Sequence, residues 1–221
     1  MTGLVSMAPW AASLTLASWL LYIAPPARLL PLLEKSRPEV SAIRMQAELR
    51  GQTLGEPGLV TLEAHVDFGV RGSSHLGGRW LLQRGRVTVA GATGSGRWVP
   101  ELEILLIHTP EQFRNWFSTR RIDFERNDLA RLGERDCFII GGLESSAQLW
   151  LDKETLEVVR FVSASGVQTD YRAYSNFDRL RLPGVIEVQR GGTPLLLEIE
   201  SVELAPELGP NDFSRSWLSD R

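Results

Sequence analysis

Two stretches in which apolar and polar side chains alternate residue by residue limit this chain to a fold built on β-strands. In residues 43–50 every second side chain is apolar, from Ile43 to Leu49, and residues 60–71 show the same alternation from Val60 to Val70. Successive side chains of a strand point to opposite faces of a sheet. We therefore predict two long neighbouring strands, over 43–50 and 60–71, in a broad curved sheet with one dry face and one wet face.

The last third of the chain carries the same signature in shorter pieces. Between Cys137 and Phe213, short apolar segments about 8 to 12 residues apart are separated by turn residues, as in an up-and-down antiparallel sheet. The expected strands are 139–143, 149–152, 156–162, 168–174, 182–189 and 194–204. The chain is thus predicted to be mainly β.

The middle of the chain is less regular. Apolar positions predict two strands on either side of Arg84-Gly85, and Leu102, Ile104 and Leu106 predict another strand after the Gly-rich loop 91–96. Glu101 and Glu103 would then lie on the wet face of that strand. The Gly-rich loop is not a dinucleotide site, because a helix should start at its glycines and the sequence there leads to Pro100 instead.

One helix is clearly indicated after this region. Thr109 to Gln112 form a capping box with proline at the first helical position. Phe113, Trp116 and Phe117 follow at helical spacing and form an aromatic stripe on one face. The stripe can be ordinary core packed on the concave side of the sheet, or the helix can be a lid that yields to lipid chains. A shorter helix is predicted over 29–36, ended by Pro38.

The N-terminal segment predicts export. Residues 1–27 hold no charged side chain, and Ala8 to Ala24 are almost all apolar. We interpret 1–27 as a signal peptide cleaved between Ala17 and Ala27, with an uncleaved anchor as the alternative, and 28–221 as one domain. We therefore expect a periplasmic protein. Lipidation is not expected, because no cysteine directly follows the apolar run.

Composition argues against several classes of function. The net charge of −3 is dispersed in both signs, so a nucleic-acid partner is not expected. Cys137 is the only cysteine, and His65, His75 and His108 share no ligand spacing, so we expect neither a metal nor a cofactor. Without a Gly-x-Ser-x-Gly motif, a serine hydrolase lacks its usual anchor. Five arginines near the predicted aromatic helix form either a solvated rim or a contact for anionic headgroups: Arg114, Arg120, Arg121, Arg126 and Arg131.

The order and spacing of the C-terminal segments resemble those of the LolA/LolB-like lipoprotein carriers of the Gram-negative cell envelope. The matching positions are 149–160, 171–174, 180–183, Gly191-Gly192 and 203–213. The resemblance implies an open half-barrel made of a single curved antiparallel sheet, with short helices over its concave apolar face. Because a lipidation cysteine is absent, it implies the soluble carrier branch. It also implies a monomer that carries acylated lipoprotein or lipid from an inner-membrane release complex to an outer-membrane acceptor.

Such a carrier needs an apolar cavity rather than catalytic residues. Each acyl CH₂ that moves from water into an apolar cavity gains about 0.8 kcal/mol. The residues expected to form the wall and lid of the cavity are Leu62, Val66, Phe68, Trp80, Trp98, Phe113, Trp116 and Phe117. Two alternatives stay open: an envelope sensor or interaction protein that binds lipid on the same fold, and an exported hydrolase whose catalytic residues are scattered over loops.

Overall fold

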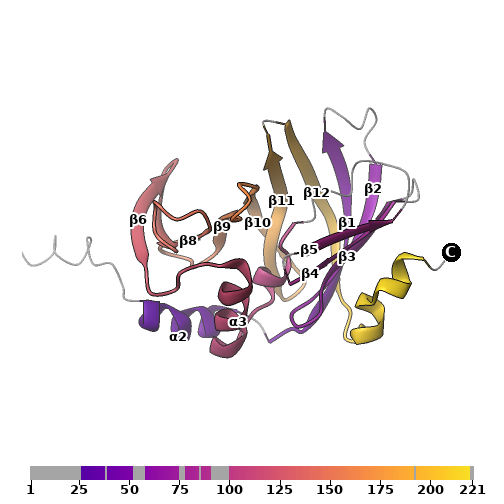
Figure 1. The fold of residues 1–221 in the computed structure, drawn as a ribbon, viewed down its shortest axis with the longest axis horizontal. Coiled ribbons are helices and arrows are strands. Elements are labelled where there is room, and N and C mark those ends of the chain that lie inside the picture. The colour runs from indigo at the N-terminus through magenta and orange to yellow at the C-terminus, as the bar shows by residue number, and fades with distance from the viewer. Residues whose placement is uncertain are drawn as a thin grey trace, which may run out of the picture.

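The fold is built around one large antiparallel sheet (Figure 1). The computed structural model describes residues 26–37, 39–51, 58–74, 78–84, 86–90, 100–191 and 193–219. The strands found in this part of the chain are β1 Ala42–Gly51, β2 Gly58–His65, β3 Gly69–Ser74, β4 Arg79–Gln83, β5 Arg86–Ala90, β6 Asn127–Leu132, β7 Arg135–Ile140, β8 Gln148–Asp152, β9 Val158–Val162, β10 Gln168–Phe177, β11 Leu180–Arg190 and β12 Thr193–Leu204.

The order of the strands explains how the helices come to cover the sheet. It runs β5-β4-β3-β2-β1-β12-β11-β10-β9-β8-β7-β6, with β1 paired to β12 in the middle. Strands β5 and β6 are consecutive in sequence but stand at opposite ends of the sheet. The connection between them therefore has to run from one end of the sheet to the other, and it contains the 3₁₀ turn η2 Glu103–Leu105 and the helix α3 Pro110–Arg120.

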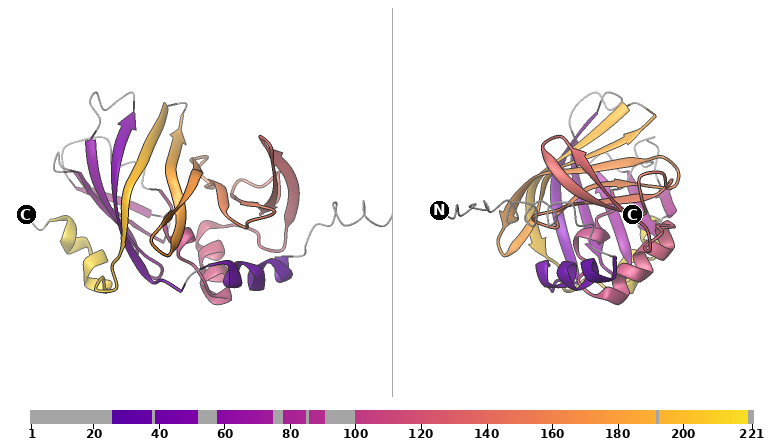
Figure 2. Two further views of the ribbon diagram at one scale, coloured as in Figure 1. Left: turned by 180° about the vertical axis from the view of Figure 1, so that it is seen from behind. Right: turned by 90° about the vertical axis from the view of Figure 1, so that its left-hand side faces the viewer.

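Two helices lie together along the open side of the curved sheet. Helix α2 Pro26–Ser36 is next to α3, and both lie below the curve of the strands in Figure 2. Their apolar side chains share one main core cluster with the inner face of the sheet, including Leu29 and Leu33 of α2 and Phe113 of α3. The predicted open half-barrel with helices on its concave face is confirmed. None of the helices in the described ranges is long and apolar enough to cross a membrane.

The other face of the sheet carries two smaller apolar clusters. A C-terminal cluster joins Ala42, Leu81, Ala205, Leu208 and Phe213, with Phe68 and Leu218 packed against it. It is covered by the 3₁₀ turns η3 Pro210–Phe213 and η4 Arg215–Leu218, which lie outside the curve in Figure 1. An outer cluster on β7 to β9 joins Cys137, Ile139, Trp150 and Val159.

The prediction of one long strand over 60–71 was wrong, because the segment is a hairpin. Strand β2 ends at His65, residues 66–68 form a turn, and β3 starts at Gly69. The turn depends on Gly69, whose φ is +116° and whose added Cβ would lie 2.1 Å from the carbonyl oxygen of Leu82. Alternation continues through a tight turn, so periodicity alone does not separate one long strand from two short ones.

The prediction of a strand from Leu102 to Leu106 was also wrong. The segment is a 3₁₀ turn in which Leu102 to Ile107 are all buried. The segment packs between the sheet and α3, so it is enclosed on several sides and has no wet face. Its neighbours behave as expected: the two strands around Arg84-Gly85 are β4 and β5, and the six C-terminal strands are β7 to β12. Strand β6 had no clear signal in the sequence.

Candidate functional site

The helix predicted after residue 109 is present and is fixed by its N-terminal cap. The Thr109 hydroxyl accepts from the backbone N–H of Gln112 at 3.2 Å, and the Gln112 side chain reaches back to the backbone N–H of Thr109. This capping box starts α3 at Pro110 and sets the rotation of its aromatic stripe. The capping box and the helix are therefore confirmed.

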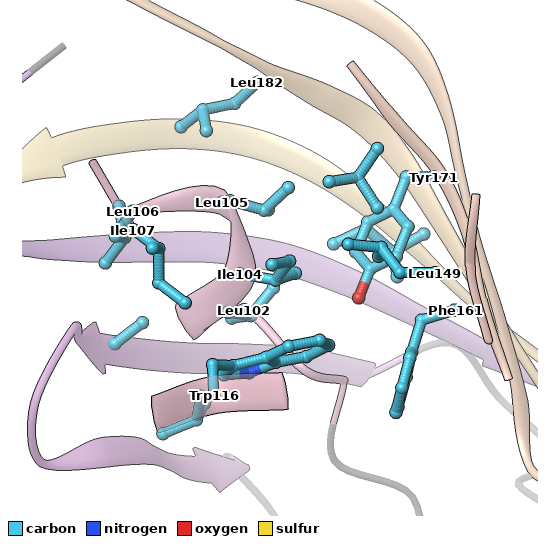
Figure 3. Close-up of a cluster of buried hydrophobic side chains, with 14 of the residues drawn as sticks. Leu102, Ile104, Leu105, Leu106, Ile107, Trp116, Leu149, Phe161, Tyr171 and Leu182 are labelled. Carbon is cyan, nitrogen blue, oxygen red and sulfur yellow. The ribbon is translucent and has the colours of Figure 1, made fainter. Parts of the chain in front are cut away.

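The aromatic stripe of α3 faces the sheet. Phe113, Trp116 and Phe117 are at most 5% exposed. The ring of Trp116 lies 5.2 Å from that of Phe161 on β9, and Phe117 stacks on Phe124 at 5.3 Å. Figure 3 shows Trp116 of α3 and Ile104 of η2 directed at two side chains of the sheet, Phe161 and Tyr171. The stripe therefore fills the concave side of the half-barrel.

An open cavity of about 190 Å³ remains beside this packing. It lies where the end of α2, the end of η2, the β8–β9 turn and the strands β10 and β11 meet. Apolar side chains dominate the lining: Val40, Leu105, Leu106, Leu156, Val158, Leu180 and Leu182. Tyr174 lines it as well and donates its hydroxyl to the carbonyl oxygen of Val158 at 2.9 Å. Burial raises the pKa of Tyr174, so the phenol stays neutral.

Arg37 is a charged residue in this mostly apolar lining. Its Nη1 donates to the carbonyl oxygen of Ile104, and its guanidinium lies 5.4 Å from the centre of the Phe113 ring. Burial lowers the pKa of Arg37 to about 10. The side chain thus ties the end of α2 to both η2 and α3, and it stays charged at neutral pH.

A buried ionic group lies where α3 meets η2. Arg120 donates from Nε and Nη2 to Oε2 of Glu101 at 3.0 and 2.5 Å, and from Nη2 to Oε1 of Glu103 at 3.0 Å. All three residues are at most 9% exposed. The expectation that Glu101 and Glu103 lie on a wet strand face was therefore wrong, and Arg120 belongs to the core and not to a solvated rim.

The two carboxylates share one cation, and this shapes their protonation. Burial is the largest cause that raises the pKa of Glu103, to about 8, and the charge of Glu101 adds to it while Arg120 opposes it. Burial alone would lower the pKa of Arg120, but Glu103 and Glu101 outweigh it and the pKa is raised. Oε2 of Glu103 has no hydrogen-bond partner in the described residues. At neutral pH Glu103 therefore keeps its proton.

The structure brings most of the residues predicted for the cavity into the main cluster. Leu62, Trp80, Phe113, Trp116 and Phe117 are buried in it, and Val66 packs against it from the β2–β3 turn. Phe68 does not join them. It lies in the C-terminal cluster on the other face, where it stacks on His65 at 4.1 Å. Trp98 lies outside the described residues. A contact with lipid remains a prediction for each of these side chains.

Sequence reasoning missed Arg37 and the Glu101–Glu103–Arg120 group. Nothing in the sequence separates a buried arginine from an exposed one. A signal was nevertheless present for the glutamates, because alternating Glu and apolar residues lie just before the capping box. Their partner Arg120 lies at the far end of α3, 17 residues after Glu103, so the spacing gave no sign of the contact.

The histidines make separate structural contacts. His65 stacks on Phe68, and Nδ1 of His108 lies 3.1 Å from the carbonyl oxygen of Leu106. In the described ranges no group of three or more His, Cys, Asp or Glu side chains could hold a metal ion. His75 lies outside those ranges.

Comparison with known proteins bears on the fold. No protein-family model and no curated protein matches the chain. Among solved structures it is similar to a LolA superfamily protein from Nitrosomonas europaea, with 13% identity and a TM-score of 0.49 over 89% of this chain and all of that one. It is also similar to a DUF1329 family protein from Desulfovibrio piger, with 10% identity and a TM-score of 0.50 over 87% of this chain and 97% of that one. At these identities the likeness concerns the fold alone.

Proposed function

We propose that this protein is a periplasmic carrier that shields the acyl chains of a lipoprotein or lipid inside the half-barrel while they move toward the outer membrane. The observation that supports this most directly is the concave apolar face, which is covered by a separate connection and not by a second sheet. A cover of this kind can move without unpairing any strand. The role requires no catalytic residue.

The cavity as it stands is too small for the cargo, so the function requires the cover to move. About 190 Å³ is little more than the engineered cavity of roughly 150 Å³ that holds one benzene molecule. Acyl chains would therefore take the place of the aromatic stripe, namely Phe113, Trp116 and Phe117. In such a carrier, the arrangement with the stripe packed against the sheet would be the closed form.

The energies permit this exchange. Exposing three large apolar side chains costs about 1.5–3 kcal/mol each, or roughly 5–9 kcal/mol together. One acyl chain with about fifteen methylene groups gains about 12 kcal/mol at about 0.8 kcal/mol for each. A single chain is thus enough to displace the stripe. The stripe in turn competes with the cargo and weakens its binding, which allows release to an acceptor.

The test is whether acylated cargo binds and displaces Trp116. Protein purified from a periplasmic extract should carry lipid or lipoprotein detectable by mass spectrometry, and an added acylated peptide should bind to delipidated protein. Binding should also change the tryptophan fluorescence as Trp116 leaves its contact with Phe161. The absence of both co-purified lipid and peptide binding would refute the carrier role.

A matched pair of variants locates the bound chains. The fluorescence change should be largely lost in Trp116→Phe and kept in Trp150→Phe, because Trp150 is equally a buried tryptophan but lies in the outer cluster on the other face. Both variants remove one indole and keep an aromatic ring. A signal lost equally in both, or only in Trp150→Phe, would place the cargo elsewhere.

A further inference from the structure

Arg37 offers more hydrogen-bond donors than its surroundings use. A guanidinium has five N–H donors. In the described part of the chain, Nη1 donates to the carbonyl oxygen of Ile104 and the guanidinium lies near the Phe113 ring, while no carboxylate comes within ion-pair distance of it. The remaining N–H donors of Arg37 have no acceptor among the described residues. They are therefore available to a molecule that enters the cavity.

The charge at this cavity is unbalanced. Of the charged residues that line it, Arg181 pairs with Glu157 at 2.5 Å, so these two cancel and Arg37 leaves the lining with one net positive charge. Burial lowers the pKa of Arg37 without discharging it at neutral pH. A partly desolvated cation without a counter-ion is unfavourable, and an anion beside it removes that cost.

The rest of the lining is apolar. Leu105 at the end of η2 and Leu106 directly after it lie on one side, and Leu156, Leu180 and Leu182 lie on the other. A molecule that matches both features has an alkyl chain that ends in an anionic group. The contacts to Ile104 and Phe113 hold the planar fork of Arg37 in place, which favours bidentate pairing with a carboxylate or a phosphate.

We propose that the cavity binds a single-chain amphiphile with an anionic head, in which a carboxylate or phosphate pairs with Arg37 and the alkyl chain runs among the leucines. This rests on the proposed carrier function and narrows its cargo. The cavity of about 190 Å³ takes the head and the first part of the chain. The rest of the chain follows the inner face of the sheet, where the stripe of α3 now lies.

The experiment compares ligands that share one chain and differ in their heads. Dodecanoate, dodecyl phosphate and dodecanol are titrated below their micelle concentrations into delipidated protein, above the pKa of the carboxylic acid, by calorimetry. Hydrogen bonds to a charged group predict that dodecanoate or dodecyl phosphate binds roughly 10- to 100-fold more tightly than dodecanol. A preference for one of the two anions identifies the head that the site accepts.

Variants separate the head from the chain. Arg37→Met should abolish the preference for the anions and keep the binding of dodecanol, whereas Arg28→Gln, which removes an exposed charge from α2 outside the cavity lining, should keep the preference. Arg37→Lys keeps the charge but loses the fork, so it should keep only part of the preference.

The outcomes distinguish the two proposals. If dodecanol binds wild-type protein as tightly as both anions, the anionic head is wrong and the carrier role stands. If none of the three ligands binds, the single-chain ligand is wrong, and the acylated peptide then decides the carrier role separately. Because the first comparison uses wild-type protein only, it holds even if Arg37→Met does not fold.

Discussion

Replacing Glu103 by glutamine should remove a pH dependence from the stability of the fold. Glu103 is 4% exposed and shares Arg120 with Glu101, and burial is the main cause that raises its pKa from 4.5 to about 8. The folded protein therefore binds a proton that the unfolded chain releases between these two values. Stability from this group is complete below about pH 4.5 and is lost as the pH rises through about 8.

The size of the effect follows from the same two values. Each pH unit between them should cost about 1.4 kcal/mol, and the full difference is on the order of 5 kcal/mol. Water that enters as the group ionises reduces this figure, so roughly 3–5 kcal/mol is expected. Glutamine has nearly the same shape and stays neutral, so Glu103→Gln should match the wild type near pH 5 and exceed its stability near pH 8.5 by roughly this amount.

Urea unfolding at a series of pH values measures this difference. The free energy of unfolding of the variant minus that of the wild type should rise by about 1.4 kcal/mol for each pH unit across the window. Glu154→Gln serves as a control, because Glu154 is exposed in the β8–β9 turn and its difference should stay flat. A flat difference for Glu103→Gln as well would show that Glu103 is ionised at neutral pH and would refute the argument from burial.

Two further substitutions test the local features that place the cover and the first hairpin. Gly69→Ala should destabilise the fold by at least about 2 kcal/mol in urea unfolding, because it combines a φ of +116° with a clash against Leu82; Gly191→Ala, with a φ of +63° and open space around it, should cost less, and equal costs would contradict this reading. Thr109→Ala should cost about 1 kcal/mol through the lost cap and Thr109→Ser should restore most of it, whereas an equal loss in both would mean that the methyl group and not the hydroxyl matters.

The strands that could be predicted from the sequence are those with one dry and one wet face. Alternation located β1 and the C-terminal hairpins, because there the local pattern and the tertiary environment agree. The capping box located α3 for a similar reason, since its donors and acceptors lie within four residues of one another. Local rules of this kind do not require knowledge of what packs against the segment.

The predictions that failed concern segments whose surroundings are set by a distant part of the chain. Leu102 to Leu106 alternate like a strand, but the segment is enclosed between the sheet and α3, and its apparent wet face is the Glu101–Glu103–Arg120 group. Arg71 was expected on the wet face of a strand and is instead buried under the C-terminal turns, where it pairs with Glu63 and lies 5.0 Å from the ring of Trp217. In both places a distant segment covers a polar side chain, and the sequence near that side chain carries no sign of it.

In the proposed carrier, these covered polar groups explain how the cover would hold one closed position and still be able to leave it. A buried ion pair adds little net stability, because desolvation offsets much of the attraction, but it tolerates few geometries. Arg120 with its two glutamates, and the Tyr171 hydroxyl that donates to the carbonyl oxygen of Glu101 at 2.9 Å, therefore fix where η2 and α3 sit. In the carrier role proposed above, acyl chains would replace the contacts of the aromatic stripe, because one apolar surface substitutes for another. In that proposed role the polar contacts would set the position of the closed state, while the stripe would set how tightly cargo must bind to open it.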